Sequence, residues 1–219
     1  ILSRHYARKS KQSKKRIGQK EVIIVMKEFV ITRSFFDNLP RKLVFYSDYF
    51  EFQNKDSRNA QAARIEKDSI IGIKYGIHYI KGLEFYIGRD YQIIFVLKNK
   101  KEFKINFKTF YRYKLTEKHQ LYQEIINEIW NFCVNDLVMD FYHQFNDHQS
   151  FIICNLKFQN KQILLNKKWL TINEIDIKSY HDKLIIYEIE NPNNSSHLLF
   201  YLKDMNSVVL WSLIKTLKK

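Results

Sequence analysis

Glycine and proline are scarce, with five Gly and two Pro among 219 residues. This composition excludes collagen-like and Pro/Gly-rich low-complexity chains. Apolar runs are short as well: the longest, residues 22–26, is far below the eighteen or so residues of a membrane-spanning helix. Lys27 and Glu28 interrupt it and no small-residue cleavage site follows, so a secretory signal is not favoured. We expect a globular protein whose strands and helices are joined by short polar turns.

Cysteine is almost absent. Cys133 and Cys154 are the two cysteines, each beside apolar or aromatic residues. Two such residues are too few for a disulfide framework or a zinc site, so we expect buried free thiols and a reducing, cytoplasmic location.

Signatures of catalysis and cofactor binding are also lacking. The sequence has no glycine-rich phosphate loop, zinc-protease helix or nucleophile elbow. His143, Asp147 and His148 could ligate a metal, but two histidines five apart share a helical face poorly, and a polar helix end is favoured. We predict no catalytic residue, no metal site and no cofactor, and hence a protein that is not an enzyme.

Positive charge is abundant, with a net charge of +14. The first 20 residues hold eight basic side chains and no acidic one, so this segment alone contributes +8. We expect residues 1–26 to form a flexible basic extension that could bind phosphates or anionic lipid without specificity. The candidate residues are Arg8, Lys9, Lys14, Lys15 and Arg16. Met26 opens the first patterned segment, so whether residues 1–25 belong to the native protein stays open.

A second basic group, here called the lysine strip, lies on a predicted hairpin. It consists of Lys98, Lys100, Lys101, Lys104 and Lys108. Phe103, Ile105 and Phe107 alternate with polar residues, which predicts a half-buried strand with lysines on its outer face. The strip could contact phosphates, or it could only keep the sheet soluble and blunt its edge.

The first part of the chain is strand-like and then becomes helical. We predict two strands within residues 41–53 around a turn at Ser47 and Asp48, and a third over 64–75. Three more follow at 83–88, 91–98 and 101–108, with turns at residues 88–90 and 99–100. From Leu115 the apolar period changes to about 3.6 residues, which predicts a long helix that continues toward Phe145.

The same order then begins again. Strands are predicted at 151–158, 162–166, 169–178, 183–190 and 197–202, followed by a helix over 205–217 with Asp204 as its cap. The segments "IGIK" (71–74) and "IDIK" (175–178) are placed in the third strand of each half, whereas the repeated "FQNK" (52–55 and 158–161) is interpreted as coincidence. We predict two modules, residues 27–148 and 149–219, the second lacking a strand or two. The fold class is mainly β with some α.

This pattern resembles the pleckstrin-homology-like (PH-like) fold, a partly open antiparallel barrel closed by a C-terminal helix. The resemblance rests on the third strands "IIGIKYG" and "NEIDIKSY", the hairpin "YQIIFVLKNKKEFKINF" and closing helices that contain Trp130 and Trp211. The chain is similar to bacterial proteins of Bacteroidota type with two such domains in tandem. In lipid-binding members, basic residues at the first hairpin loop grip phosphates. Here that loop holds Ser47-Asp48 in one module and only Lys161 in the other, which departs from the family pattern.

Two functions are compatible with these observations. The first is a non-catalytic cytoplasmic binding or scaffold protein that holds a protein partner along a sheet edge or in the groove between modules. The alternative is a polyanion binder that uses the basic extension and the lysine strip on nucleic acid or an anionic membrane surface.

Overall fold

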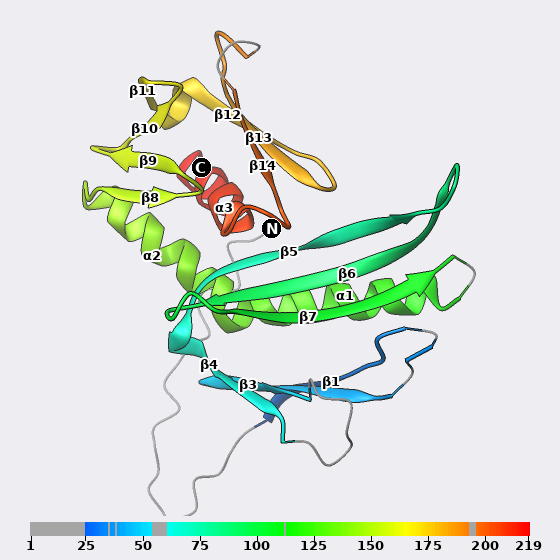
Figure 1. Ribbon diagram of the computed structural model, residues 1–219. Helices are drawn as coiled ribbons and strands as arrows, with labels where there is room; N and C mark the ends of the chain where they lie inside the picture. Colours follow the sequence, from blue (N-terminus) through cyan, green and yellow to red (C-terminus); the bar gives the residue numbers. More distant parts are fainter. Residues whose placement is uncertain (1–24, 35, 38, 54–60, 112, 193–195) are drawn as a thin grey trace, which may run out of the picture.

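The computed structural model of the chain describes residues 25–34, 36–37, 39–53, 61–111, 113–192 and 196–219 (Figure 1). Within these residues the chain forms four antiparallel sheets and three α-helices, and none of the sheets closes into a barrel. A four-stranded sheet, a three-stranded sheet and a helix follow one another in the first half, and the same order recurs in the second. The predicted mainly β fold with helices is confirmed.

The described residues of the first half form seven strands. Its two sheets have the orders β1-β2-β3-β4 and β5-β6-β7, with a short 3₁₀-helix, η3 (Lys67–Ser69), between them. The strands are β1 (Val25–Ile31), β2 (Arg41–Tyr46), β3 (Tyr49–Phe52), β4 (Ala63–Glu66), β5 (Ile70–Lys81), β6 (Tyr86–Leu97) and β7 (Glu102–Phe110). The hairpin around Ser47-Asp48 is confirmed. Because β1 begins at Val25, residues 25 and 26 belong to the first sheet and not to the extension, whose other residues lie outside the described part.

The turn predicted at residues 88–90 is wrong, because β6 continues through it. The chain reverses at residues 82–85 instead, where the Gly82 N–H donates to the Phe85 carbonyl at 2.7 Å. Gly88 serves close packing and not a turn: a Cβ atom there would lie 2.4 Å from the Thr109 carbonyl oxygen of β7.

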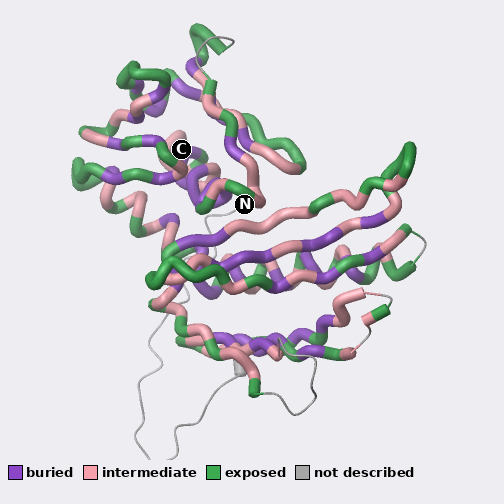
Figure 2. The backbone as a smooth tube through the Cα atoms, in the orientation of Figure 1, coloured by how far each residue is buried: buried purple, intermediate pink, exposed green. Residues whose placement is uncertain are grey.

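Aromatic side chains join the two sheets of the first half. The ring of Phe50 lies 4.7 Å from that of Phe95, and Phe45 lies 5.3 Å from Phe132. Helix α1 (Leu115–Ile129) contacts β1 and β7, so it covers the space between the sheets. Figure 2 shows the buried residues along these strands and the exposed residues at the hairpin ends.

The long helix begins at Leu115 and continues past Phe145, as predicted. A π-helical turn, η4 (Trp130–Val134), separates α1 from α2 (Asn135–Asn146). Three consecutive residues of this turn, Phe132, Cys133 and Val134, are buried. A single helix face cannot bury three successive residues, so the helix is in contact with protein on more than one side here.

The second half, in the part that the structure describes, also forms seven strands, so the prediction that it lacks a strand or two is wrong. Its sheets have the orders β11-β10-β9-β8 and β12-β13-β14. The elements are β8 (Phe151–Ile153), β9 (Leu156–Gln159), β10 (Gln162–Leu165), β11 (Lys168–Thr171), η5 (Ile172–Glu174), β12 (Ile175–Ser179), β13 (Lys183–Glu188), β14 (Ser196–Phe200) and α3 (Ser207–Leu217).

Two predicted strands are each divided in the structure, once by a turn and once by a 3₁₀-helix, and neither break contains glycine. The segment 151–158 is two strands around Cys154-Asn155, and both turn residues have positive φ, 53° and 62°. The segment 169–178 is likewise two strands, divided by η5. Asparagine adopts the left-handed conformation more readily than most residues, and here it stands where Gly is the usual signal.

Of the two repeated segments, only the Ile-rich pair lies in corresponding strands of the two halves. "IGIK" lies in β5 and "IDIK" in β12, each the fifth strand of its half and not the third, and each following a 3₁₀-helix. "FQNK" begins at the end of β3 in the first half but at the end of β9, a second strand, in the other. This tetrapeptide therefore has no structural equivalence.

Candidate functional site

The loop between β14 and α3, residues 201–206, joins the second half to β5. Asn206 is buried, and its backbone N–H donates to the Ile73 carbonyl at 2.9 Å. Its side chain accepts from the Ile73 N–H at 3.0 Å and donates to the Ile71 carbonyl at 3.2 Å. Asn206, and not the predicted Asp204, is the residue before α3; the Asp204 carboxylate instead accepts from the Phe200 N–H at 2.6 Å.

Two glycines of β5 make this contact possible. A Cβ atom at Gly72 would lie 2.5 Å from Met205, and one at Gly76 would lie 3.2 Å from Leu202. Residues 72 and 76 are on the same face of the strand, because side chains alternate with a period of two. The loop therefore packs against the two positions of this β5 face that carry no side chain, on either side of Lys74.

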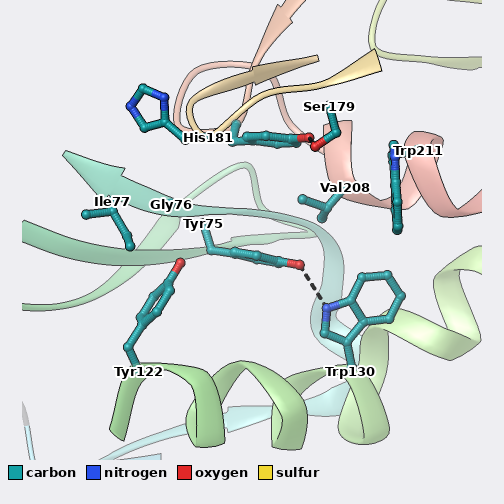
Figure 3. A pocket seen from close by; sticks show the side chains of 10 residues that line it. Tyr75, Gly76, Ile77, Tyr122, Trp130, Ser179, His181, Val208 and Trp211 are labelled. Atoms are coloured by element: carbon teal, nitrogen blue, oxygen red, sulfur yellow. Dashed lines mark hydrogen bonds between the residues drawn. The ribbon is translucent and has the colours of Figure 1, made fainter. Parts of the chain in front are cut away.

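A cavity of about 270 Å³, here called the aromatic cavity, lies beside this contact (Figure 3). Both halves of the chain line it. Its walls are formed by Tyr75, Gly76 and Ile77 of β5, Tyr122 and Trp130 of the long helix, Ser179, His181 and Tyr201 near the ends of β12 and β14, and Val208 and Trp211 of α3. Figure 3 shows Trp130 and Trp211, one from each half, at one end and Tyr122 at the other.

Four polar side chains of the aromatic cavity form two hydrogen-bonded pairs. The Trp130 indole N–H donates to the Tyr75 hydroxyl at 2.8 Å, and the hydroxyls of Ser179 and Tyr201 lie 2.6 Å apart. Burial raises the pKa of Tyr75 to about 12 and also raises the pKa of Tyr122, so both phenols stay neutral. No Lys, Arg, Asp or Glu lines the cavity among the described residues. Such a site favours an apolar or aromatic group over a phosphate.

A second cavity of about 310 Å³ continues along β5. It shares Gly76, Ile77, His181 and Tyr201 with the first and extends past Tyr79 to Lys203. The rings of Tyr79 and His181 meet edge to face at 5.0 Å between the two sides. Together the two cavities form a groove, here called the β5 groove, with β5 on one side and residues 179–182 and 200–203 on the other.

The lysine strip lies away from this groove, on the β6–β7 hairpin. Lys98, Lys100 and Lys101 are exposed near the turn, while Lys104 and Lys108 are exposed on β7. Acidic residues stand among them: Glu102 pairs with Lys74 at 2.6 Å, and Asp90 lies 4.0 Å from Lys108. The tail candidates Arg8, Lys9, Lys14, Lys15 and Arg16 lie outside the described residues.

Both cysteines are free thiols, as predicted. Cys133 is buried in η4, whereas Cys154 is only half-buried, in the β8–β9 turn. The Cys154 thiol donates to the Met205 carbonyl at 3.1 Å. Burial raises the pKa of each thiol to about 12, so neither is a ready nucleophile.

Other candidates do not form a site. His143 lies in the last turn of α2, and Asp147 and His148 follow its end. Across the described part of the chain, no three His, Cys, Asp or Glu side chains are grouped so as to hold a metal ion. No helix there is long and apolar enough to cross a bilayer.

The residues of the aromatic cavity were not identified as a site from the sequence. In the sequence, Trp130 and Trp211 indicated only the two closing helices. The available signal was the pair Gly72 and Gly76 within an Ile-rich strand, because glycine inside a strand often marks a close approach of another segment. No protein-family model matches the chain, and no curated protein matches it significantly.

Proposed function

We propose that this is a non-catalytic binding protein that holds a protein partner in the β5 groove, with an apolar side chain of the partner in the aromatic cavity. The observation that carries the proposal is a cavity lined by aromatic side chains from both halves of the chain. We also propose that the chain is similar to tandem PH-like proteins. The repeated order of a four-stranded sheet, a three-stranded sheet and a helix supports this similarity.

The chemistry of the groove suits a protein ligand. Trp and Tyr are the side chains most often found at the energetic centre of protein interfaces, because they bury a large area and keep a polar atom. Here the Trp130 N–H already donates to the Tyr75 hydroxyl, so a ligand would contact mainly the faces and edges of the rings. The rim offers His181, Asp182 and Lys203 for polar contacts.

Tryptophan fluorescence tests the proposal. Of the three tryptophans, Trp130 and Trp211 line the aromatic cavity, while Trp169 lies on β11 outside it. In a Trp169→Phe background, emission therefore reports on the cavity alone. The probes are peptides selected from a random phage-displayed library on the immobilised full chain.

We expect selected peptides to change the emission saturably and to lose roughly thirtyfold in affinity, about 2 kcal/mol, when Trp211 becomes Ala. Trp169→Ala is the matched control and should bind as the parent does. Equal binding by the parent and Trp211→Ala would contradict the proposal, and so would the absence of any selected peptide.

The polyanion alternative is supported by Lys98, Lys100 and Lys101 on one exposed turn, and it ranks second because acidic residues pair with neighbouring lysines. The two functions differ in salt dependence. Binding through several phosphates weakens steeply with added salt, whereas binding in an uncharged cavity does not.

A further inference from the structure

We propose that the partner segment is an extended peptide that adds to the free edge of β5 as a further strand. This inference rests on the proposed function and specifies the partner's conformation. In the three-stranded sheet β5 is an edge strand, since β6 is the one strand with which it pairs among the residues that the structure describes.

The direction of the β5 backbone groups follows from two sets of hydrogen bonds. On β6, the Ile87 carbonyl accepts from Tyr111, beyond the end of β7, so odd-numbered residues of β6 face β7. The even-numbered residues of β6 therefore face β5, and in this register they pair with even-numbered residues of β5. The odd-numbered residues of β5 point away from the sheet. Ile73 confirms this, because its N–H and carbonyl both bond to Asn206.

Beyond Ile73 the same edge is unpaired. By the two-residue period the N–H and carbonyl groups of Tyr75, Ile77 and Tyr79 also point outward. Among the described residues, no group is found to hydrogen-bond with these backbone atoms. Tyr75 and Ile77 line the aromatic cavity, and Ile77 and Tyr79 line its continuation. The unpaired edge and the groove therefore coincide.

The shape of the groove selects a single extended segment. Asn206 already bonds to this edge: its backbone N–H donates to the Ile73 carbonyl, and its side-chain oxygen accepts from the Ile73 N–H in place of a strand carbonyl. Residues 179–182 and 200–203 form the opposite wall, which obstructs the approach of the edge of a second sheet. A helix would satisfy its own backbone and leave the β5 groups unpaired.

The chemistry of the partner follows from strand geometry. The free edge from residue 75 to residue 79 matches about five residues of an extended chain, roughly 17 Å. Side chains on alternate residues would face the aromatic cavity, so we expect apolar or aromatic residues with a spacing of two. His181, which meets Tyr79 across the groove and has a 61% exposed side chain, would turn outward to admit the segment.

Backbone substitution in the peptide tests the inference. Each selected peptide is prepared with N-methyl groups at single positions. We expect N-methylation at alternate residues to weaken binding at least tenfold, because it removes the donors that face β5. N-methylation at the intervening residues is the matched control and should have little effect.

Amide exchange gives a second readout on the full chain. In the free protein the amides of Tyr75, Ile77 and Tyr79 should exchange fast and become protected when a selected peptide binds. The amides of Lys74, Gly76 and His78, bonded to β6, should be protected in both states.

The outcomes separate the two proposals. If Trp211→Ala weakens binding while N-methylation has no positional effect and the three amides stay unprotected, strand addition is wrong and the binding function stands. Selected sequences with apolar residues at spacings of three and four would also contradict strand addition. Equal binding by parent and Trp211→Ala would overturn both.

Discussion

At the scale of single residues, Asn206 connects the two halves most directly. It is buried, has a φ of 67°, and makes three hydrogen bonds to Ile71 and Ile73. Asn206→Ala would leave the Ile73 N–H and the Ile71 carbonyl without their side-chain partner and place Ala in a left-handed conformation. We expect a loss of about 2–4 kcal/mol in the free energy of unfolding, measured by urea denaturation.

Asn206→Gly separates the two causes. Glycine accepts the left-handed conformation but removes the same side-chain hydrogen bonds. We expect Asn206→Gly to lower the free energy of unfolding by about 1 kcal/mol less than Asn206→Ala does. A loss under 0.5 kcal/mol for both variants, far below the ~1–3 kcal/mol of a buried unsatisfied group, would show that the contact does not stabilise the protein.

Lys118 is a buried cation of the first half. Its ammonium donates to the carbonyl and the hydroxyl of Thr32, at 2.5 Å each, and lies 5.5 Å from the centre of the Phe107 ring. Burial, aided by the nearby charge of Lys114, lowers the pKa of Lys118 from 10.5 to about 8. The unfolded chain therefore holds this proton more tightly than the folded protein does.

A pH dependence follows from this difference. Between pH 8 and about 10.5 the unfolded state binds more protons at this site, so stability should rise with pH across that window relative to a variant without the ammonium. We expect the free energy of unfolding of the parent, minus that of Lys118→Met, to be flat below pH 8 and to increase above it. A difference that is constant up to pH 10.5 would rule out a lowered pKa.

At the scale of elements, the four strands of the β8–β11 sheet are joined by three two-residue turns of one kind. Cys154-Asn155, Asn160-Lys161 and Asn166-Lys167 all have positive φ at both positions, as type I′ turns require. Lys161 and Lys167 have φ values of 62° and 69°, which disfavour a lysine.

Glycine should relieve this strain. We expect Lys161→Gly and Lys167→Gly each to raise the free energy of unfolding by about 0.5–1 kcal/mol, measured by thermal denaturation. Lys157→Gly, at an exposed position in the middle of β9, is the control and should lower it by a similar amount. Equal destabilisation by all three variants would contradict the turn assignment.

These turns also explain how far the sequence predicts the elements. The β2–β3 hairpin, β7 and the long helix were predicted because each has a clear apolar period. The strands of the second half were undercounted because Cys154-Asn155 stands where a glycine turn is expected, and because η5 divides β11 from β12 without a turn signal. In β6 the error was the opposite: Gly88 suggested a turn but only permits close packing against Thr109.

The candidate site was beyond sequence analysis for a different reason. The lysine strip is contiguous, so its exposure could be predicted, and the structure shows it exposed. The aromatic cavity combines residues of β5 with residues of α3, and the hydrogen bond that aligns these segments joins positions 133 residues apart. No local pattern encodes such a separation.

At the scale of the whole molecule, the cavity exists because the second half is held against the first. Helix α2 packs against α3, and α3 contacts β5, so the long helix and Asn206 fix the same contact from two directions. Variants that loosen either connection should therefore also weaken the peptide binding proposed for the β5 groove, although the substituted residues lie outside it.

The π-helical turn should tolerate the deletion of one residue better than the insertion of one. A π turn accommodates one residue more than an α turn, so deleting the exposed Asn131 would restore a regular helix and keep α1 and α2 in their present phase. Inserting one residue there would rotate α2 by about 100° and carry α3 away from β5. Related chains should thus differ from this one by a deletion at this point and not by an insertion. The orientation of their two halves, and with it the groove, should be the same.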